Sequence, residues 1–216
     1  TEANAALEPE RLAGADAAIG GDHAAWSWSV GVFAARLEDA IVNVTLGAGP
    51  GTFPPGVFVP AGGAYRQRQN AGLIEASGAE AEAQGVLGDR LSWRAAFSYT
   101  RARFDGGALD GLRPAQAPEW SASAGLDWRA TDMLTLAAAL SYESGRFEDD
   151  QNSRELDGAA VLDLRAEQAL TDALSIYAAL DNALDTDLET AETADGIESF
   201  GPPRAIRLGV RLRTGR

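Results

Sequence analysis

The stretch Leu91-Ser-Trp-Arg-Ala-Ala-Phe-Ser-Tyr99 sets the pattern for the rest of this chain. Its odd-numbered positions carry apolar or aromatic side chains, and its even-numbered positions carry serine, arginine and alanine. Because successive side chains of a β-strand point to opposite faces, this alternation predicts a strand with one apolar and one mostly polar face. The alternation recurs in Trp120–Ala130, Leu134–Tyr142, Ala160–Leu170, Leu174–Leu184 and Ile206–Leu212.

The N-terminal part of the chain carries three further strand patterns. Trp26–Ala35 alternates clearly, and Leu12–Gly20 is a weaker, alanine-rich strand. The glycines of Gly20–His23 predict a tight turn between these two. Leu73–Gly85 alternates glutamate and glutamine with alanine. The chain is therefore expected to contain about nine long strands.

The strand lengths and the connections between the strands indicate the fold class. Strands of about ten residues match a tilted strand that crosses a bilayer. Short connections alternate with long ones: the short ones are Leu87–Arg90, Ala130–Met133 and Leu170–Ala173, and the long ones are Phe104–Pro118, Phe147–Asp157 and Asp185–Arg204. This arrangement predicts an all-β, antiparallel transmembrane β-barrel of the bacterial outer membrane.

The strand count predicts that the barrel is not complete in this sequence. Single-chain bacterial barrels have an even number of strands, whereas about nine are expected here. An open sheet would leave two edges whose backbone groups have no partner in lipid. We therefore expect the remaining strands to come from sequence not shown here.

The composition excludes several function classes. The 216 residues contain no cysteine, and all 18 basic residues are arginine. Thiol chemistry, Schiff-base lysines and Walker-type phosphate loops are thereby excluded. The net charge of -14 argues against a nucleic-acid partner. The single histidine, His23, and the acidic loop residues Asp185, Asp187 and Glu189 lack the partners or spacing of a metal site, so we expect no metal, no cofactor and no enzymatic activity.

A possible extra hairpin joins Ala40–Leu46 to Tyr65–Asn70, and the glycine- and proline-rich Gly47–Ala64 between them is expected to be an exposed loop. Aromatic side chains in this loop could stack on a flat ligand, or they could pack against neighbouring loops. The candidate ligand-binding residues here are Phe53, Phe58, Tyr65, Arg66 and Arg68.

Four motifs in order resemble the C-terminal half of a TonB-dependent outer-membrane receptor. They are a loop at Ala3–Glu10, Tyr65–Gly72 followed by Gly78–Glu80, Asp181–Asp185 at the top of the penultimate strand, and Gly201–Arg204 followed by Ile206–Leu212. One departure is Leu212, which stands where the family usually ends on an aromatic residue, with Arg213–Arg216 trailing beyond it.

The resemblance implies a 22-stranded barrel of which residues 1–216 are the C-terminal portion, with the plug domain and the N-terminal half of the barrel absent from this sequence. It also implies import of a scarce nutrient, with a ferric siderophore as the expected cargo, driven by the TonB complex through the missing N-terminal region. The other implied partners are outer-membrane lipid, the plug domain and the remaining strands.

The two faces of the predicted strands receive separate assignments. The residues expected to face lipid are Leu91, Trp93, Ala95, Phe97, Leu126, Trp128, Leu136, Leu140, Leu162, Leu164, Leu208 and Val210. The residues expected to face the lumen are Arg94, Arg129, Arg165, Arg207 and Arg211. Segments expected outside the cell are Gly47–Gln69, Asp105–Ala117, Glu148–Asp157 and Thr186–Pro203.

Two alternatives to this interpretation remain open at this point. The first is a soluble, β-rich binding module, which would need another reason for its ten-residue strands and for aromatic residues near the strand ends. The second is a small, self-closed outer-membrane barrel with a structural or adhesive role, which would need an even strand count.

Overall fold

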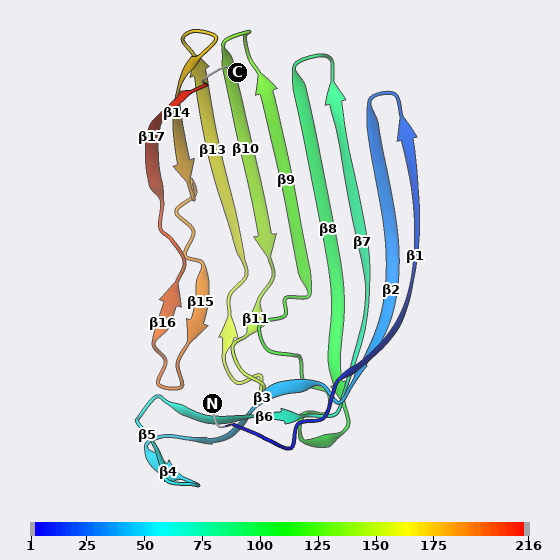
Figure 1. Cartoon of the computed structure of the whole chain (residues 1–216), viewed down its shortest axis with the longest axis vertical. Helices are drawn as coiled ribbons and strands as arrows, with labels where there is room; N and C mark the ends of the chain where they lie inside the picture. The colour runs from blue at the N-terminus through cyan, green and yellow to red at the C-terminus, as the bar shows by residue number, and fades with distance from the viewer. Residues whose placement is uncertain (1–2, 214–216) are drawn as a thin grey trace.

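In a computed structural model the chain forms one broad, curved antiparallel sheet with its long loops gathered at one end (Figure 1). The structure describes residues 3–213; the predicted tail beyond Leu212 extends into residues that lie outside this range. Within the described part the large sheet has nine strands, which confirms the predicted count. In spatial order they are β1 (Arg11–His23), β2 (Trp26–Glu38), β7 (Leu73–Leu87), β8 (Leu91–Asp105), β9 (Trp120–Arg129), β10 (Leu134–Glu143), β13 (Ala159–Ala169), β14 (Leu174–Asp181) and β17 (Ala205–Leu212).

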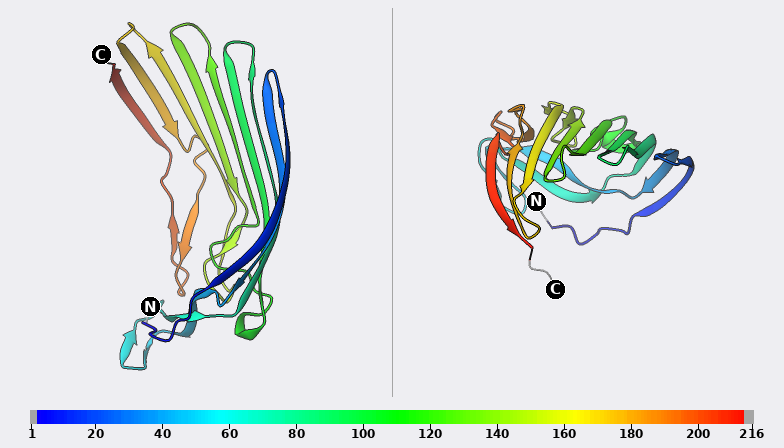
Figure 2. Two further views of the ribbon diagram at one scale, coloured as in Figure 1. Left: turned by 45° about the vertical axis from the view of Figure 1, so that its right-hand side comes forward. Right: turned by 90° about the horizontal axis from the view of Figure 1, so that it is seen from above.

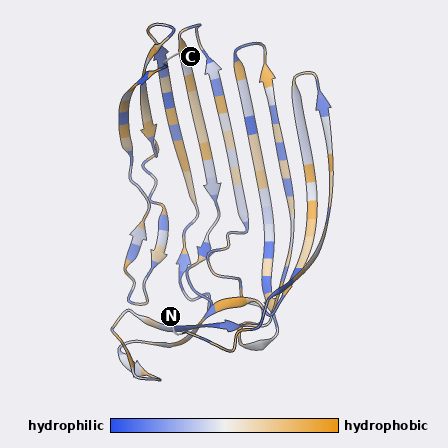
Figure 3. Ribbon diagram, in the orientation of Figure 1, coloured by the Kyte–Doolittle hydropathy of each residue, from blue (hydrophilic) through white to orange (hydrophobic). Residues whose placement is uncertain are grey.

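The register extends the apolar–polar alternation across neighbouring strands. Trp128 lies opposite Leu91 of β8 and Leu136 of β10, and Leu140 lies opposite Leu162 of β13. Because paired residues of an antiparallel ladder point to the same face, these side chains form one continuous apolar face. Every residue predicted to face lipid falls on it. Figure 3 shows the resulting mixture of hydrophobic and hydrophilic bands along the strands.

The prediction of a tight turn at Gly20–His23 is wrong. β1 runs through these residues to His23, and the chain reverses at the next two alanines. The glycines allow a close approach instead: a Cβ on Gly20 would lie 2.7 Å from the carbonyl oxygen of Trp28, and one on Gly21 would lie 3.0 Å from Trp28 Nε1. Glycine here makes room for the neighbouring strand.

β7 and β8 are longer than the sequence pattern predicted. Leu73–Leu87 and Leu91–Asp105 pair residue for residue along their whole length, so the loop expected to begin at Phe104 begins after Asp105. The pattern stopped at Tyr99 because Arg101 and Arg103 then occupy the face that is apolar elsewhere. Backbone pairing continues where the hydrophobic alternation ends.

The predicted extra hairpin is confirmed: β3 (Ile41–Ala48) pairs with β6 (Ala64–Asn70) as a separate two-stranded sheet. It lies across the loop end of the large sheet (Figure 2). The other loops contain the short elements β4 (Gly51–Phe53), β5 (Val57–Val59), η1 (Gly107–Leu109), β11 (Arg146–Phe147), β12 (Glu155–Leu156), β15 (Glu189–Glu192) and β16 (Glu198–Phe200).

Side chains are buried mainly where the loops pack, and not on the faces of the sheet. Leu156, Phe104 and Leu109 are buried at the loop end, whereas Leu208 on β17 is 78% exposed. β1 and β17 are the two edges of the large sheet, and each pairs on one side only. The sheet therefore does not close on itself. Within residues 3–213 there is no helix long and apolar enough to span a membrane.

Candidate ligand-binding surface and membrane face

The polar face of the large sheet carries Arg94, Arg129, Arg165, Arg207 and Arg211. Four of them form ion pairs: Arg94–Asp127 at 3.1 Å, Arg165–Glu167 at 3.0 Å, Arg207–Asp181 at 2.6 Å and Arg211–Glu167 at 3.0 Å. Arg129 donates to the backbone carbonyl of Asp89 instead. Ion pairs exposed to solvent, such as Arg94–Asp127, contribute little stability and are favourable in contact with water. The polar face is therefore suited to a hydrated surface, and its position toward a lumen remains a prediction.

Arg165 is further positioned by an aromatic ring. Its guanidinium carbon lies 4.2 Å from the centroid of the Tyr177 ring. Tyr177 lies opposite Gly209 of β17, where a Cβ would collide with that ring. Gly209 therefore leaves the space in which the ring covers β17. The result is an ordered arginine–aromatic surface beside the open edge of the sheet.

Two arginines predicted to bind ligand share one face of the β3–β6 hairpin. Arg66 lies opposite Thr45, and Arg68 lies opposite Asn43. Arg68 is exposed; Arg66 is half-buried, and its Nε has no hydrogen-bond partner among the described residues. Neither guanidinium belongs to an ion pair formed within residues 3–213. The Arg66 Nε is buried, so the donors that an anionic ligand could use are the Nη groups of Arg66 and the guanidinium of Arg68.

The three candidate aromatic residues have different surroundings. Phe53 and Tyr65 stack on each other with ring centroids 5.0 Å apart, and the Tyr65 hydroxyl donates to the carbonyl of Pro54 at 2.5 Å. These two rings support the loop that carries them. Phe58 is 66% exposed and is the one of the three whose ring is largely free. Contact of any of them with a ligand remains a prediction.

The loops are joined by buried polar contacts that the sequence did not reveal. Arg146 donates from Nε to Gln116 Oε1 at 2.8 Å and from Nη2 to the carbonyl of Glu189 at 2.9 Å. Arg154 donates to the carbonyl of Glu192 at 3.1 Å. Each contact connects loops that follow different strands. No pattern in a single sequence marks these arginines, because their partners lie 30 to 43 residues away.

Asp149 organises the turn between β11 and β12. Its carboxylate accepts from the Ser153 amide at 2.8 Å and from the Ser153 hydroxyl, and it lies 3.2 Å from Arg154 Nη1. Burial by itself opposes ionisation, but the Ser153 donors and the Arg154 charge outweigh it and hold the pKa of Asp149 below its usual value. Asp149 is therefore ionised wherever this turn is intact near neutral pH.

Two of the residues that the sequence analysis rejected as metal ligands have other contacts. Asp185 forms an ion pair with Arg204 at 3.1 Å, and the His23 ring stacks on Trp26 at 4.8 Å. In the part of the chain that the structure describes, no three His, Asp or Glu side chains are grouped so as to hold a metal ion.

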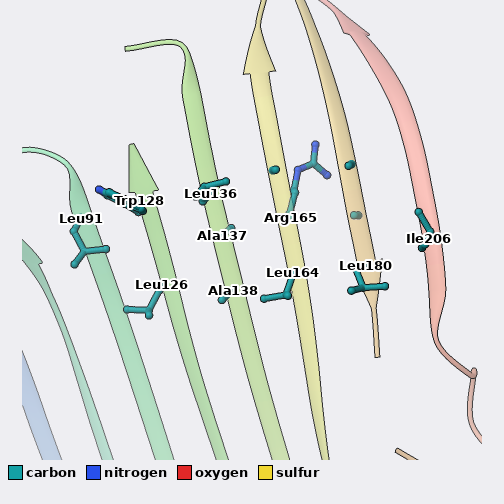
Figure 4. Close-up of a pocket in the computed structure, with 13 residues that line it drawn as sticks. Leu91, Leu126, Trp128, Leu136, Ala137, Ala138, Leu164, Arg165, Leu180 and Ile206 are labelled. Carbon is teal, nitrogen blue, oxygen red and sulfur yellow. The ribbon is translucent and has the colours of Figure 1, made fainter. Parts of the chain in front are cut away.

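The apolar face contains a broad shallow groove of about 650 Å³ across strands β8 to β17. In Figure 4 the side chains that line it come from neighbouring strands, and they include Leu91, Leu126, Trp128, Leu136, Leu164, Leu180 and Ile206. Trp128 is 47% exposed on this face. No second sheet covers these residues within the described part, so the face has the character of a surface that contacts lipid.

Comparisons with known proteins agree with this architecture. The iron-regulated outer membrane virulence protein of Vibrio cholerae is 27% identical over 168 residues, which are 76% of this chain and 25% of that protein. The ferrioxamine receptor of Yersinia enterocolitica is 31% identical over 130 residues, 58% of this chain and 16% of that protein. The chain thus spans about a quarter or less of the length of these curated relatives.

The structure of the ferric yersiniabactin uptake receptor of Yersinia pestis has the same fold. It superposes with a TM-score of 0.75 at 18% identity and covers 94% of this chain and 30% of that protein. Residues 1–183 match the family described as TonB dependent receptor-like, beta-barrel. One of these relatives is named as an outer-membrane protein and two are named as receptors, and none has the name of an enzyme. The chain belongs to the TonB-dependent receptor family, and its nine-stranded sheet is part of a β-barrel wall in the bacterial outer membrane.

Proposed function

We propose that this chain is part of the barrel of a TonB-dependent importer whose cargo is a ferric siderophore. Family membership supports the TonB-dependent mechanism, and a relative named as a ferrioxamine receptor supports the cargo class. The observation that carries the proposal is the β3–β6 hairpin, which presents Arg66 and Arg68 without carboxylate partners among the described residues. The oxygen ligands of a ferric chelate carry negative charge, and arginine binds such oxygens with paired donors.

We also propose that residues 1–216 are the C-terminal portion of this barrel. A barrel of this class has 22 strands around a plugged lumen, whereas the large sheet here has nine. Its edges, β1 and β17, would each leave a row of backbone groups unpaired in hydrocarbon, at several kcal/mol for each group. In this proposal the remaining strands of the same receptor pair with those edges, and its plug domain covers the polar face. TonB binds to the N-terminal region of the receptor, outside residues 1–216.

The test of the cargo uses the whole receptor in cells that lack other iron receptors. Binding and uptake of a panel of ⁵⁵Fe-labelled siderophores are measured for the wild type and for the double variant Arg66→Gln and Arg68→Gln. Loss of two charge-assisted hydrogen bonds should weaken binding of the transported chelate by roughly tenfold or more. The matched control is the double variant Arg204→Gln and Arg90→Gln, because it also removes two positive charges, from exposed residues paired with Asp185 and Asp132.

Two results would contradict the proposal. If no ferric siderophore in a broad panel binds the wild-type receptor, the cargo class is wrong. If uptake persists in cells without TonB, the energised mechanism is wrong. If the double variant Arg66→Gln and Arg68→Gln binds the chelate as tightly as the control variant, the hairpin is not part of the ligand-binding surface.

A further inference from the structure

The apolar face of the large sheet changes its chemistry close to the loop end. Tyr99 of β8 lies opposite Trp120 of β9, and their ring centroids are 4.2 Å apart. Arg101 and Arg103 follow Tyr99 at alternate positions and so lie on the same face of β8. From Leu91 to Tyr99 this face of β8 carries leucine, alanine and aromatic side chains. Guanidinium groups replace them over the last part of the strand.

The register places a third arginine beside these two. Arg103 lies opposite Glu75 of β7, and Glu75 lies opposite Arg36 of β2. We call Arg36, Arg101 and Arg103 the rim cluster. At about 3.4 Å for each residue of a strand, Arg101 lies roughly 7 Å beyond Tyr99 and Arg103 roughly 14 Å beyond it.

These distances match the level of the lipid headgroups. Tyrosine and tryptophan on the outside of a membrane barrel mark the boundary of the hydrocarbon. Beyond that boundary the polar region of each leaflet is roughly 5–8 Å thick. Because the strands of such a barrel tilt by about 35–45°, Arg101 lies roughly 5–6 Å and Arg103 roughly 10–11 Å beyond Tyr99 along the membrane normal. Arg101 thus lies at the depth of the phosphate groups, and Arg36 and Arg103 lie beyond it, from where their side chains can extend back toward that depth.

The surface between these arginines is hollow. A groove of about 730 Å³ lies there, and Arg36, Arg101 and Arg103 are among the residues that line it. Small side chains on the same face of the strands, Ala34 and Ser77, form part of its floor. A headgroup can therefore approach the guanidinium groups without displacing a bulky side chain.

Among residues 3–213, two arginines of the rim cluster form ion pairs and the third does not. Arg36 pairs with Glu75 at 2.6 Å, and Arg103 pairs with Glu119 at 2.7 Å. Arg101 is exposed and takes part in none of the ion pairs or side-chain hydrogen bonds formed within the described residues. Further out on the same face, Arg11 carries one positive charge, and Glu38 and Asp105 carry two negative charges. At the level of Arg36, Arg101 and Arg103, three arginines face Glu75 and Glu119, which leaves one net positive charge there on a chain whose net charge is -14.

We infer that the rim cluster binds the phosphate of an anionic lipid headgroup in the outer leaflet, with Arg101 as its principal contact. Arginine presents a planar set of donors that matches a phosphate group, and basic residues next to a membrane attract anionic lipids. Arg36 and Arg103 keep further N–H donors while bound to their glutamates. The inference depends on the position of the sheet in the membrane and not on the proposed cargo.

The experiment measures retention of a phosphorylated lipid by the whole receptor in detergent, using native mass spectrometry. The probe is diphosphoryl lipid A, and the same lipid without its phosphates is the comparison. Arg101→Gln should weaken binding of the phosphorylated lipid about fivefold, the effect of one arginine beside an anionic lipid. Arg90→Gln is the matched control, because it removes the same charge in a short turn at the other end of the sheet, where Arg90 pairs with Asp132.

Siderophore binding is measured for each variant as well, and a variant that binds siderophore is folded. Lipid retention tests this inference and siderophore binding tests the proposed function, so that failure of one can be distinguished from failure of the other. Retention of diphosphoryl lipid A that falls for Arg101→Gln alone supports the inference. Equal retention by the two variants, equal retention of the lipid without phosphates, or complete displacement by inorganic phosphate at the same concentration would each overturn it.

Discussion

The carboxylate of Asp150 accepts two hydrogen bonds from Thr45, a residue 105 positions earlier in the chain. Oδ2 accepts from the Thr45 amide at 2.9 Å, and Oδ1 accepts from the Thr45 hydroxyl at 2.6 Å. Asp150 is 5% exposed, so these bonds are shielded from water. They attach the β3–β6 hairpin, with Arg66 and Arg68, to the turn between β11 and β12. The position of the candidate ligand-binding residues thus depends on a loop distant in sequence.

Replacing Asp150 should release the hairpin. Asp150→Ala removes both hydrogen bonds and should reduce the free energy of local opening by about 2–3 kcal/mol, the range for bonds to a charged group. Hydrogen–deuterium exchange at the Thr45 amide measures this directly. Asp172→Ala, in an exposed short turn at the opposite end, is the control. Equal exchange at Thr45 in the two variants would show that the Asp150 contact does not hold the hairpin.

Arginine substitutions on the apolar face should depend on depth. Leu140 lies opposite Ala124 and Leu162, midway between the level of Trp128 and the level of Trp120. Leu140→Arg should therefore cost about 2–4 kcal/mol of folding free energy in lipid. Leu136 lies opposite Trp128, close to the turn end, so Leu136→Arg should cost about 0–1 kcal/mol.

The measurement is reversible unfolding of the whole receptor in lipid vesicles. Ala139→Arg is the control, because it places the same side chain on the polar face of the same strand. A Leu140→Arg variant as stable as Ala139→Arg would argue that the apolar face does not contact hydrocarbon.

Because these 216 residues contain no cysteine, single cysteines introduced into them can test the topology of this part of the receptor. The long loops Gly47–Gln69, Asp105–Ala117, Glu148–Asp157 and Thr186–Pro203 all lie at the end of the sheet opposite the short turns, as Figure 1 shows. Ala108→Cys should react with a membrane-impermeant maleimide on intact cells, and Asp172→Cys should react after the outer membrane is permeabilised. The reverse pattern would invert the predicted orientation.

Acid should loosen the turn that Asp149 organises. The pKa of Asp149 is lower in the folded turn than in the unfolded chain, so its ionisation stabilises the turn above the unfolded pKa. That stabilisation is complete above pH 4 to 5 and is lost as the pH falls through the lower folded pKa. Proteolysis in Glu148–Asp157, measured at each pH relative to cleavage of an unstructured reference peptide, should therefore be slow at neutral pH and should rise below about pH 4.

In Asp149→Asn this acid-dependent step should be absent, and cleavage at neutral pH should already be faster. Asp187→Asn supplies a control in another loop. A wild-type cleavage rate that does not change between pH 7 and pH 3 would contradict the assignment of Asp149.

The strands of the wall were predictable because their signal is local. In Leu91–Tyr99 the face on which each side chain lies can be predicted from the residues two positions away. The same periodicity predicted the number of strands and the alternation of short turns and long loops. The β3–β6 hairpin was predictable for the same reason. The periodicity failed at Gly20 and Gly21, where glycine signals a turn but makes room for Trp28. It failed again at Arg101, where the strand continues beyond the apolar band.

The sequence by itself determined the face of each side chain. The side chains of a strand alternate between two faces, and this alternation is visible in a single strand without knowledge of its neighbour. The tertiary structure decided which residues meet across distance. The Asp150–Thr45 contact, the position of Tyr177 over Gly209, and the exposed Arg101 beside two arginines that form ion pairs all depend on register and loop packing. Such contacts join positions tens of residues apart, and no local pattern encodes them, because their energy arises only when the strands have paired and the loops have closed over them.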